Sequence, residues 1–118
     1  MSIEATIFQT LQSLASRRVY QDLAPQDVTA LPRITYQQVG GQAINFMDPT
    51  TPSLKNARFQ INVWGATRLQ AAALSRLVED ALRSEDALMT TVLAAPVAVY
   101  EPETQLYGTM QDFSFWYA

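Results

Sequence analysis

The chain has 118 residues, 48% of them hydrophobic and 16% charged, which is typical of a single globular domain spanning residues 1–118 with a core large enough to fold unaided. It contains no cysteine and no histidine, which excludes disulfides and thiol catalysis and argues against zinc or copper sites and a histidine proton shuttle. The formal charge of −3 and the scattered cations disfavour nucleic-acid binding, and the lack of a long apolar run or a cationic leader argues against a membrane span and a signal peptide.

The first predicted element is a helix over residues 3–16. Ser2 is suited to cap its N-terminus, and Glu4 suits the positive end of the helix dipole. The apolar residues recur on one side at helical spacing: Ile3, Ile7, Leu11 and Leu14. A short strand at residues 18–20 and a polar connection containing Pro25 are expected to follow.

A hairpin is predicted next. Pro32 favours an extended Leu31 and so introduces a strand at residues 33–39. The Gly40–Gly41 pair is typical of a two-residue hairpin turn, which predicts a returning strand at residues 42–46. The segment after it, residues 47–54, contains two prolines among other turn formers, and we expect an exposed loop there.

Two longer strands are predicted at residues 55–64 and 106–117, where bulky apolar and polar residues alternate. The apolar sets are Phe59, Ile61 and Val63 on the first strand and Phe113, Phe115 and Tyr117 on the second. Such strands need one covered face, which indicates an antiparallel sheet packed on one side only.

A second helix follows the first long strand. Thr67 and Gln70 match a capping box at its start, and the helical pattern fades at residues 84–86. The stripe that we expect to face the core consists of Leu69, Ala73, Leu77 and Ala81, widened by Leu74, Val78 and Leu82.

The last part of the chain is predicted to form a terminal hairpin. Residues 87–95 show no clean periodicity, a strand is expected at residues 97–100, and a polar turn at residues 101–104 leads into the final strand. The order of elements predicts an α+β fold, in which an antiparallel or mixed sheet of about four or five strands carries two amphipathic helices on one face.

Candidates for catalysis are sparse. Glu101 and Glu103 lie in a predicted solvated turn, and Asp48 is suited to forming a turn. The acidic residues between 79 and 86 lack the spacing of a calcium loop, the serines have no histidine to activate them, and no glycine-rich phosphate loop occurs. We therefore predict no catalytic, cofactor-binding or metal-binding residues, and a protein that is not an enzyme.

Candidates for a subunit interface are better supported. Alternation places Trp64 and Trp116 on the otherwise polar side of the sheet, either as a cross-strand pair covering it or as interface anchors. Arg17 and Arg18 are interpreted first as complements of the first helix's C-terminal dipole, with a role in subunit or DNA contact as the alternative.

Several segments in a fixed order carry a resemblance. They include Arg18-Val19-Tyr20, Leu31-Pro32 leading into Ile34-Thr35-Tyr36, the Gly40–Gly41 pair, residues 57–64 before a long helix, and the ending at residues 100–107 and 111–117. The set, spanning residues 5 to 117, is similar to the tail completion or tail terminator proteins of long-tailed bacteriophages and of phage-derived particles such as gene transfer agents.

The resemblance implies a structural role in the virion, assembled in the bacterial cytoplasm. Proteins of this kind form a ring, usually of six subunits, that caps the tail tube near the head, ends its polymerisation and joins the head connector; DNA passes through without specific binding. The implied partners are other copies of the chain, the tail tube protein and the connector proteins, with no membrane. The expected contact loops are Met47, Asp48, Pro49, Thr50, Thr51 and Pro52, and Glu101, Pro102, Glu103 and Thr104.

Two alternatives stay open at this point. Another head–tail connector ring subunit belongs to the same class and has a similar sequence pattern. A small ligand-binding or hydrolytic α+β domain belongs to a different class, and it would need a concave pocket with convergent polar groups.

Overall fold

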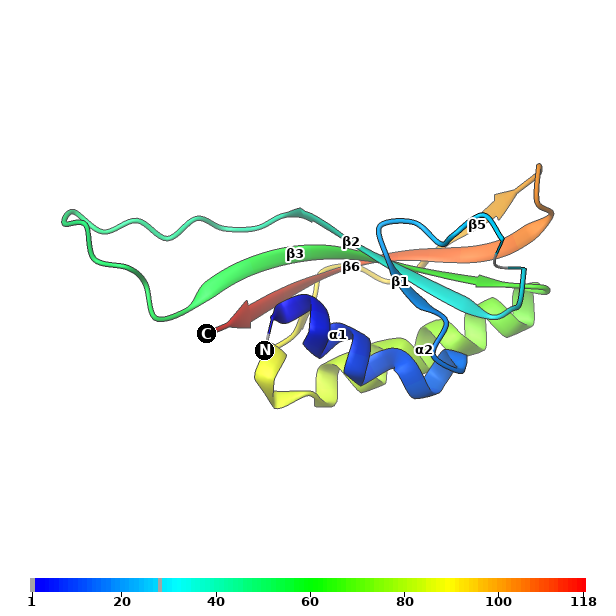
Figure 1. Ribbon diagram of the computed structural model, residues 1–118, viewed down its shortest axis with the longest axis horizontal. Coiled ribbons are helices and arrows are strands. Elements are labelled where there is room, and N and C mark those ends of the chain that lie inside the picture. Colours follow the sequence, from blue (N-terminus) through cyan, green and yellow to red (C-terminus); the bar gives the residue numbers. More distant parts are fainter. Residues whose placement is uncertain (1, 28) are drawn as a thin grey trace.

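The computed structural model of the protein describes residues 2–27 and 29–118, and it shows two layers (Figure 1). Two helices pack on one face of a mixed sheet, and the described residues place no helix on the other face, which we call the open face. The molecule is elongated, with extents of 52 × 25 × 25 Å. The predicted α+β architecture is confirmed.

The sheet is built around two long antiparallel strands. The order across it is β1 (Val19–Gln21), β2 (Arg33–Gly40), β3 (Lys55–Gly65), β6 (Leu106–Tyr117), then β4 (Thr91–Val92) and β5 (Val97–Glu101). β1 pairs with β2 in parallel and the other pairs are antiparallel. The described residues thus form six strands instead of four or five, because β6 is long enough to pair with both β4 and β5 along one edge.

The first helix is shorter than predicted but begins as expected. α1 covers Ile3–Leu11, a 3₁₀ turn continues over Gln12–Ala15, and the Ser2 hydroxyl oxygen accepts a 3.1 Å hydrogen bond from the amide of Ala5. The helical segment ends where Ser16 and Arg17 adopt positive φ angles of 50° and 67°.

The core lies between the helices and the β3–β6 pair. Period-two alternation is confirmed, because the inward side chains of both long strands are buried. The largest fully buried side chains on the sheet are Phe59, Ile61, Val63, Phe113, Phe115 and Ile34. They pack against Ile7 and Leu11 of α1 and against Val78 and Leu82 of α2 (Arg68–Ser84). Alternation in the sequence therefore identified the buried face of the sheet correctly.

The predicted buried stripe of the second helix is confirmed for Leu74, Val78 and Leu82, but its centre is wrong in rotation. α2 (Arg68–Ser84) begins with the predicted Thr67 cap, but Leu69, Ala73 and Leu77 lie on its exposed side. Leu69 is 81% exposed and Leu77 is 52% exposed. The residues that face the sheet are Ala71, Leu74, Ser75, Val78 and Leu82.

Long-range hydrogen bonds from α2 to the sheet favour this rotation. Arg68 donates to the carbonyl oxygens of Gly108 and Val99, both at 2.7 Å. About three turns further along the same face of the helix, the Glu79 carboxylate accepts a 2.7 Å hydrogen bond from Nε2 of Gln111. This bond is the largest of the causes that lower the pKa of Glu79 from its usual value. The face of α2 that bears Arg68 and Glu79 is therefore tied to β6, and the neighbouring apolar stripe is turned outward.

The predicted hairpin at Gly40–Gly41 is also wrong. β2 continues to Gly40, and the strand that returns along it is β3, with Arg33 opposite Trp64 and Gly40 opposite Arg58. Gly41 has a φ of +150°, and a Cβ there would lie 2.5 Å from the carbonyl oxygen of Asn56. Gly41 therefore permits a close passage over β3 instead of a tight turn.

The remaining uncertain stretch of the sequence is mostly irregular. Residues 87–95 contain the end of a 3₁₀ turn (Asp86–Leu88) and the two-residue strand β4. The strand at residues 97–100, the turn after it and the terminal hairpin with β6 are confirmed.

Candidate assembly surfaces

The most prominent surface element is the segment of residues 41–54, which we call the arm. It extends from the body between β2 and β3 and forms the left end of the molecule in Figure 1. All of its side chains are exposed except the half-buried Pro52. Four of the exposed side chains are large and hydrophobic: Ile44, Phe46, Met47 and Leu54.

A hydrogen-bonded clamp holds the base of the arm. Asn56 Oδ1 accepts a 2.8 Å hydrogen bond from the amide of Gln42. Its Nδ2 donates to the Ser114 hydroxyl at 2.8 Å and to the Phe115 carbonyl at 3.1 Å. One side chain on β3 thus ties the first residues of the arm to β6.

The tip of the arm contains the first predicted contact loop, Met47–Pro52. The amide of Thr50 donates a 3.0 Å hydrogen bond to Oδ1 of Asp48, and bonding to Thr50 lowers the pKa of the Asp48 carboxyl. The structure therefore bears out the role of Asp48 as a turn former and places the loop in solvent.

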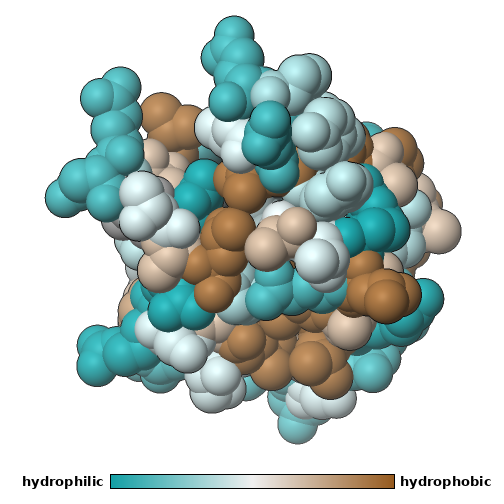
Figure 2. All heavy atoms as spheres, turned by 90° about the vertical axis from the view of Figure 1, so that its right-hand side faces the viewer, coloured by the Kyte–Doolittle hydropathy of each residue, from teal (hydrophilic) through white to brown (hydrophobic). Residues whose placement is uncertain are grey.

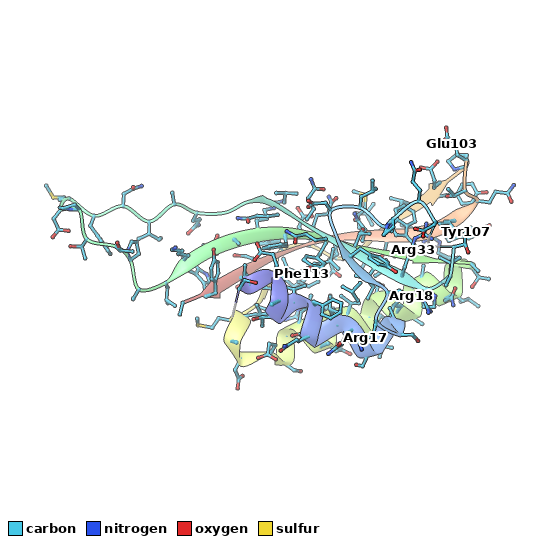
Figure 3. All side chains as sticks on the ribbon, in the orientation of Figure 1. Arg17, Arg18, Arg33, Glu103, Tyr107 and Phe113 are labelled. Atoms are coloured by element: carbon cyan, nitrogen blue, oxygen red, sulfur yellow. The ribbon has the colours of Figure 1, made fainter. Side chains whose placement is uncertain are left out.

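The second predicted contact loop lies at the opposite end of the molecule. The Glu101–Thr104 turn joins β5 to β6, and Figure 3 shows Glu103 at its outer tip. The amide of Glu103 donates a 3.2 Å hydrogen bond to Oε1 of Glu101. The two loops project from different ends and share no site.

An aromatic pair stiffens this second end, which we call the hairpin end (β5, its turn and the start of β6). The rings of Tyr100 and Tyr107 lie 4.9 Å apart, and the Arg68 guanidinium carbon lies 5.3 Å from the centre of the Tyr107 ring. Val97 and Tyr100 are exposed on β5. Figure 2, which looks onto this end, shows hydrophobic atoms interspersed among hydrophilic ones across the surface.

The two tryptophans lie on the open face as predicted, but they are not a pair. Trp64 stands opposite Gly108 and Trp116 opposite Asn56, near the two ends of the β3–β6 ladder. A Cβ at Gly108 would lie 2.6 Å from the Trp64 ring, so that ring packs directly on the backbone of β6. Both tryptophans are half-buried, and their proposed role in a subunit interface stays a prediction.

The paired arginines separate in the structure (Figure 3). Arg18 donates to the carbonyl oxygens of Pro32 at 2.8 Å and Leu31 at 3.1 Å, so it holds the segment that enters β2. Arg17 is exposed and lies beyond the last turn of the helix. The predicted complement to a helix dipole is therefore wrong, since neither helical segment has a basic residue in its last turn.

One candidate surface was missed from the sequence. The outward residues Leu69, Ala73 and Leu77, which we call the outer stripe, were assigned to the core. Their exposure follows from the bonds that Arg68 and Glu79 make with the sheet, and the helix sequence alone gives no signal for these distant partners.

The described residues include no group of three or more histidine, cysteine, aspartate or glutamate residues placed to hold a metal ion. A hollow of about 410 Å³ lies on the open face beside Trp64 and Arg33, and the buried Oδ1 of Asn62, another lining residue, has no hydrogen-bond partner in the described part of the chain. In residues 2–27 and 29–118, no helix combines the length and apolar character needed to cross a membrane.

Comparisons with known proteins agree on one class. The family described as "Tail completion protein gp17" matches residues 8–118. A chain in a structure described as the virion of a native gene transfer agent particle shares the fold, with a TM-score of 0.62 and 18% sequence identity over 97% of this chain and 92% of that one. The comparison with curated proteins gives no match.

Proposed function

The chain belongs to the tail completion protein family of bacteriophages, and from this premise we propose that it forms a closed ring of six copies that caps the tail tube. It is a structural protein of a virion or phage-like particle. In the proposed role, the ring stops further addition of tube protein and presents the surface to which the head connector binds. The family match over residues 8–118 is the observation that carries the proposal.

The shape of the molecule supports a ring. The arm and the hairpin end are its two projecting elements, and they lie at opposite ends of a body 52 Å long (Figure 1). A contact between these unlike ends is heterologous, and repeating it produces a ring if the rotation closes. A two-fold dimer, by contrast, would pair one patch with itself.

Several apolar side chains are available for contacts between subunits. The outer stripe of α2 and the half-buried Trp64 and Trp116 are candidate subunit surfaces, together with the exposed Arg17. Arg18 is less suited to this role, because its guanidinium already binds two carbonyl groups within the chain.

The two loop tips are the proposed contacts with the tube and the connector. Met47–Pro52 at the end of the arm and Glu101–Thr104 at the hairpin end project in different directions. One of them facing the tube protein and the other facing the connector proteins would give the ring two distinct sides.

The net charge suits a passage for DNA. Six copies at −3 each carry a formal charge of −18, and the part of it that lines the bore would repel a phosphate backbone. DNA would then pass without binding. A ring structure with a basic bore would contradict this part of the proposal.

The test is an assembly assay with purified tail tube protein. Tube protein is polymerised with and without this chain, and tube lengths and tube ends are examined by electron microscopy, while native mass is measured across a wide concentration range. We expect a cap of six copies at one tube end and arrested growth. Normal growth and bare ends at saturating protein would refute the proposal, and binding to the head connector alone would identify another connector ring.

A matched pair of variants tests the contact loops. Shortening the arm tip by deleting Thr50 and Thr51 is expected to reduce tube capping, because this removes part of a proposed contact without touching the clamp at Asn56. Ser13→Ala, at an exposed position on the far side of the sheet from the open face, serves as the control and should cap normally. Normal capping by the shortened arm would assign the tube contact elsewhere.

A further inference from the structure

The first part of the arm has no strand to pair with. If residues Gln42–Phe46 extend as a strand, the apolar Ile44 and Phe46 lie on one side together with Gln42, and Ala43 and Asn45 lie on the other. Among the described residues, the only backbone group of this segment that forms a hydrogen bond is the Gln42 amide, which donates to the Asn56 side chain. Ile44 and Phe46 are exposed, at 37% and 53%. The segment therefore offers unpaired backbone groups and uncovered apolar side chains together.

The opposite end of the molecule has an open strand edge. β5 (Val97–Glu101) pairs with β6 on one side, and the described residues place no strand on its other side. One carbonyl of β5, that of Val99, accepts from Arg68, and the exposed side chains include Val97 and Tyr100. An exposed edge of this kind is a template for an added strand.

We propose that Gln42–Phe46 of one copy adds as a strand to the outer edge of β5 in the next copy. This inference rests on the proposed ring and specifies how its subunits join. The two segments have five residues each. Gly41 directly precedes the first, which Met47 and Asp48 separate from Pro49, and Pro96 and Pro102 flank the second. They lie at opposite ends of the molecule, so the pairing joins two copies (Figure 1).

A second copy fits this edge better than another partner does. Each chain carries both the donor segment and the β5 edge, so a closed ring of identical copies leaves neither of these two unpaired. The clamp at Asn56 holds the start of the donor segment against β3 and β6, which directs the arm away from its own sheet. That orientation lowers the entropy lost when the arm docks.

The structure also predicts which side chains face each other. The side of β5 toward α2 borders a groove that contains the charged residues Arg76 and Asp80, whereas Val97 and Val99 lie on the open face. Ile44 and Phe46 should therefore share the open face with these two valines, because apolar cross-strand pairs stabilise a sheet. Ala43 and Asn45 would then share the other face with Ala98.

The lack of cysteine makes the contact testable by disulfide trapping. Single-cysteine variants are mixed in pairs, assembled as caps on tail tubes and oxidised. Ile44→Cys should cross-link to Val97→Cys or Val99→Cys in the same assembly. It should not cross-link to Ala98→Cys, because the side chain at position 98 lies on the opposite face of β5 from Val97 and Val99. Nor should it cross-link to Ala73→Cys, an exposed position on α2.

A proline variant provides an independent measurement. Asn45→Pro removes an amide from the proposed strand and should raise the concentration needed for half-maximal ring formation about tenfold. Ser53→Pro, at an exposed position on the same arm outside both the proposed strand and the contact loop, should leave that concentration unchanged.

The outcomes separate this inference from the proposed function. Caps that form without a cross-link between Ile44→Cys and either valine variant, or with equal cross-linking to Ala98→Cys, would overturn the strand pairing and leave the capping role standing. Cross-links with the expected alternation in concentrated protein that never caps tubes would support the pairing and overturn the capping role. Absence of both cross-links and caps would overturn both.

Discussion

Replacing Asn56 with alanine is expected to loosen the base of the arm and to lower the free energy of unfolding. The substitution removes three hydrogen bonds, one to the Gln42 amide and two to Ser114 and Phe115 of β6. Each such bond contributes about 0.5–1.5 kcal/mol net, but the groups left behind by Gln42 and Ser114 reach water. A loss of about 1–2 kcal/mol in total is therefore expected, with a fall of about 4–8 °C in melting temperature.

Two related variants divide that effect. Gln42→Pro removes only the amide that the clamp binds, so most of the stability should remain. Asn56→Asp keeps an acceptor for Gln42 but loses the donor to the Phe115 carbonyl, and its loss of stability should approach that of Asn56→Ala. Asn45→Ala, at an exposed position on the same arm, is the control and should have the same melting temperature as the native protein.

The assay combines thermal unfolding with amide hydrogen exchange. In the native protein the Gln42 amide should exchange more slowly than the amides at positions 43–46, since it alone is bonded. In Asn56→Ala this difference should vanish. A melting temperature within about 1 °C of the native protein, together with unchanged protection at Gln42, would refute the clamp.

Three further substitutions test the core, the cap and the helix–sheet bond. Phe59→Ala should lower the free energy of unfolding by about 3–5 kcal/mol in urea titrations, because this ring is fully buried, whereas exposed Leu69→Ala should change it little. Thr67→Ala should lower helix and protein stability by about 1 kcal/mol in melts followed by circular dichroism, and Thr67→Ser should not. The folded-state pKa of Glu79 is lowered by its bond from Gln111, so this stabilisation is present above the ordinary glutamate pKa and is lost as the pH falls through the folded value. Glu79→Gln should reduce the loss of unfolding free energy as the pH falls through this range. An unchanged dependence of stability on acidic pH would contradict the role given to the Glu79–Gln111 bond.

The parts of the fold that were predicted correctly are those determined by local pattern. Alternation over β3 and β6 identified both strands and their buried faces, because a long strand with one apolar face has few ways to pack. The Thr67 cap and the terminal hairpin were also found from neighbouring residues.

The errors arose where a distant partner decides between two local options. α2 has two adjacent apolar stripes, and the choice between them follows the bonds of Arg68 and Glu79 to the sheet. A Gly40–Gly41 pair is compatible with a tight turn or with a close passage of the chain over a neighbouring strand. In the structure Gly41 passes directly over the backbone of Asn56 on β3. Neither partner is near in sequence, so neither choice was visible in it.

The candidate assembly surfaces were predicted in part. The exposure of the two predicted contact loops and the face of the sheet that carries the tryptophans were predicted, because prolines and displaced aromatic residues are conspicuous in a sequence. Their separation to opposite ends was not found, since it depends on the length and direction of the β3–β6 pair. The returning strand predicted at residues 42–46 is wrong, because this segment forms no strand in the structure.

The β3–β6 ladder has a consequence for the geometry of a ring. It runs from Lys55 opposite Tyr117 to Gly65 opposite Tyr107 without a shift in register, and it connects the base of the arm to the hairpin end. In a closed ring each copy is rotated by the same angle relative to its neighbour. Any error in that angle caused by bending within a copy is multiplied by the number of copies. A stiff, continuous ladder between the two joining ends keeps that error small, so the number of subunits in the ring would be determined largely by the twist of two strands.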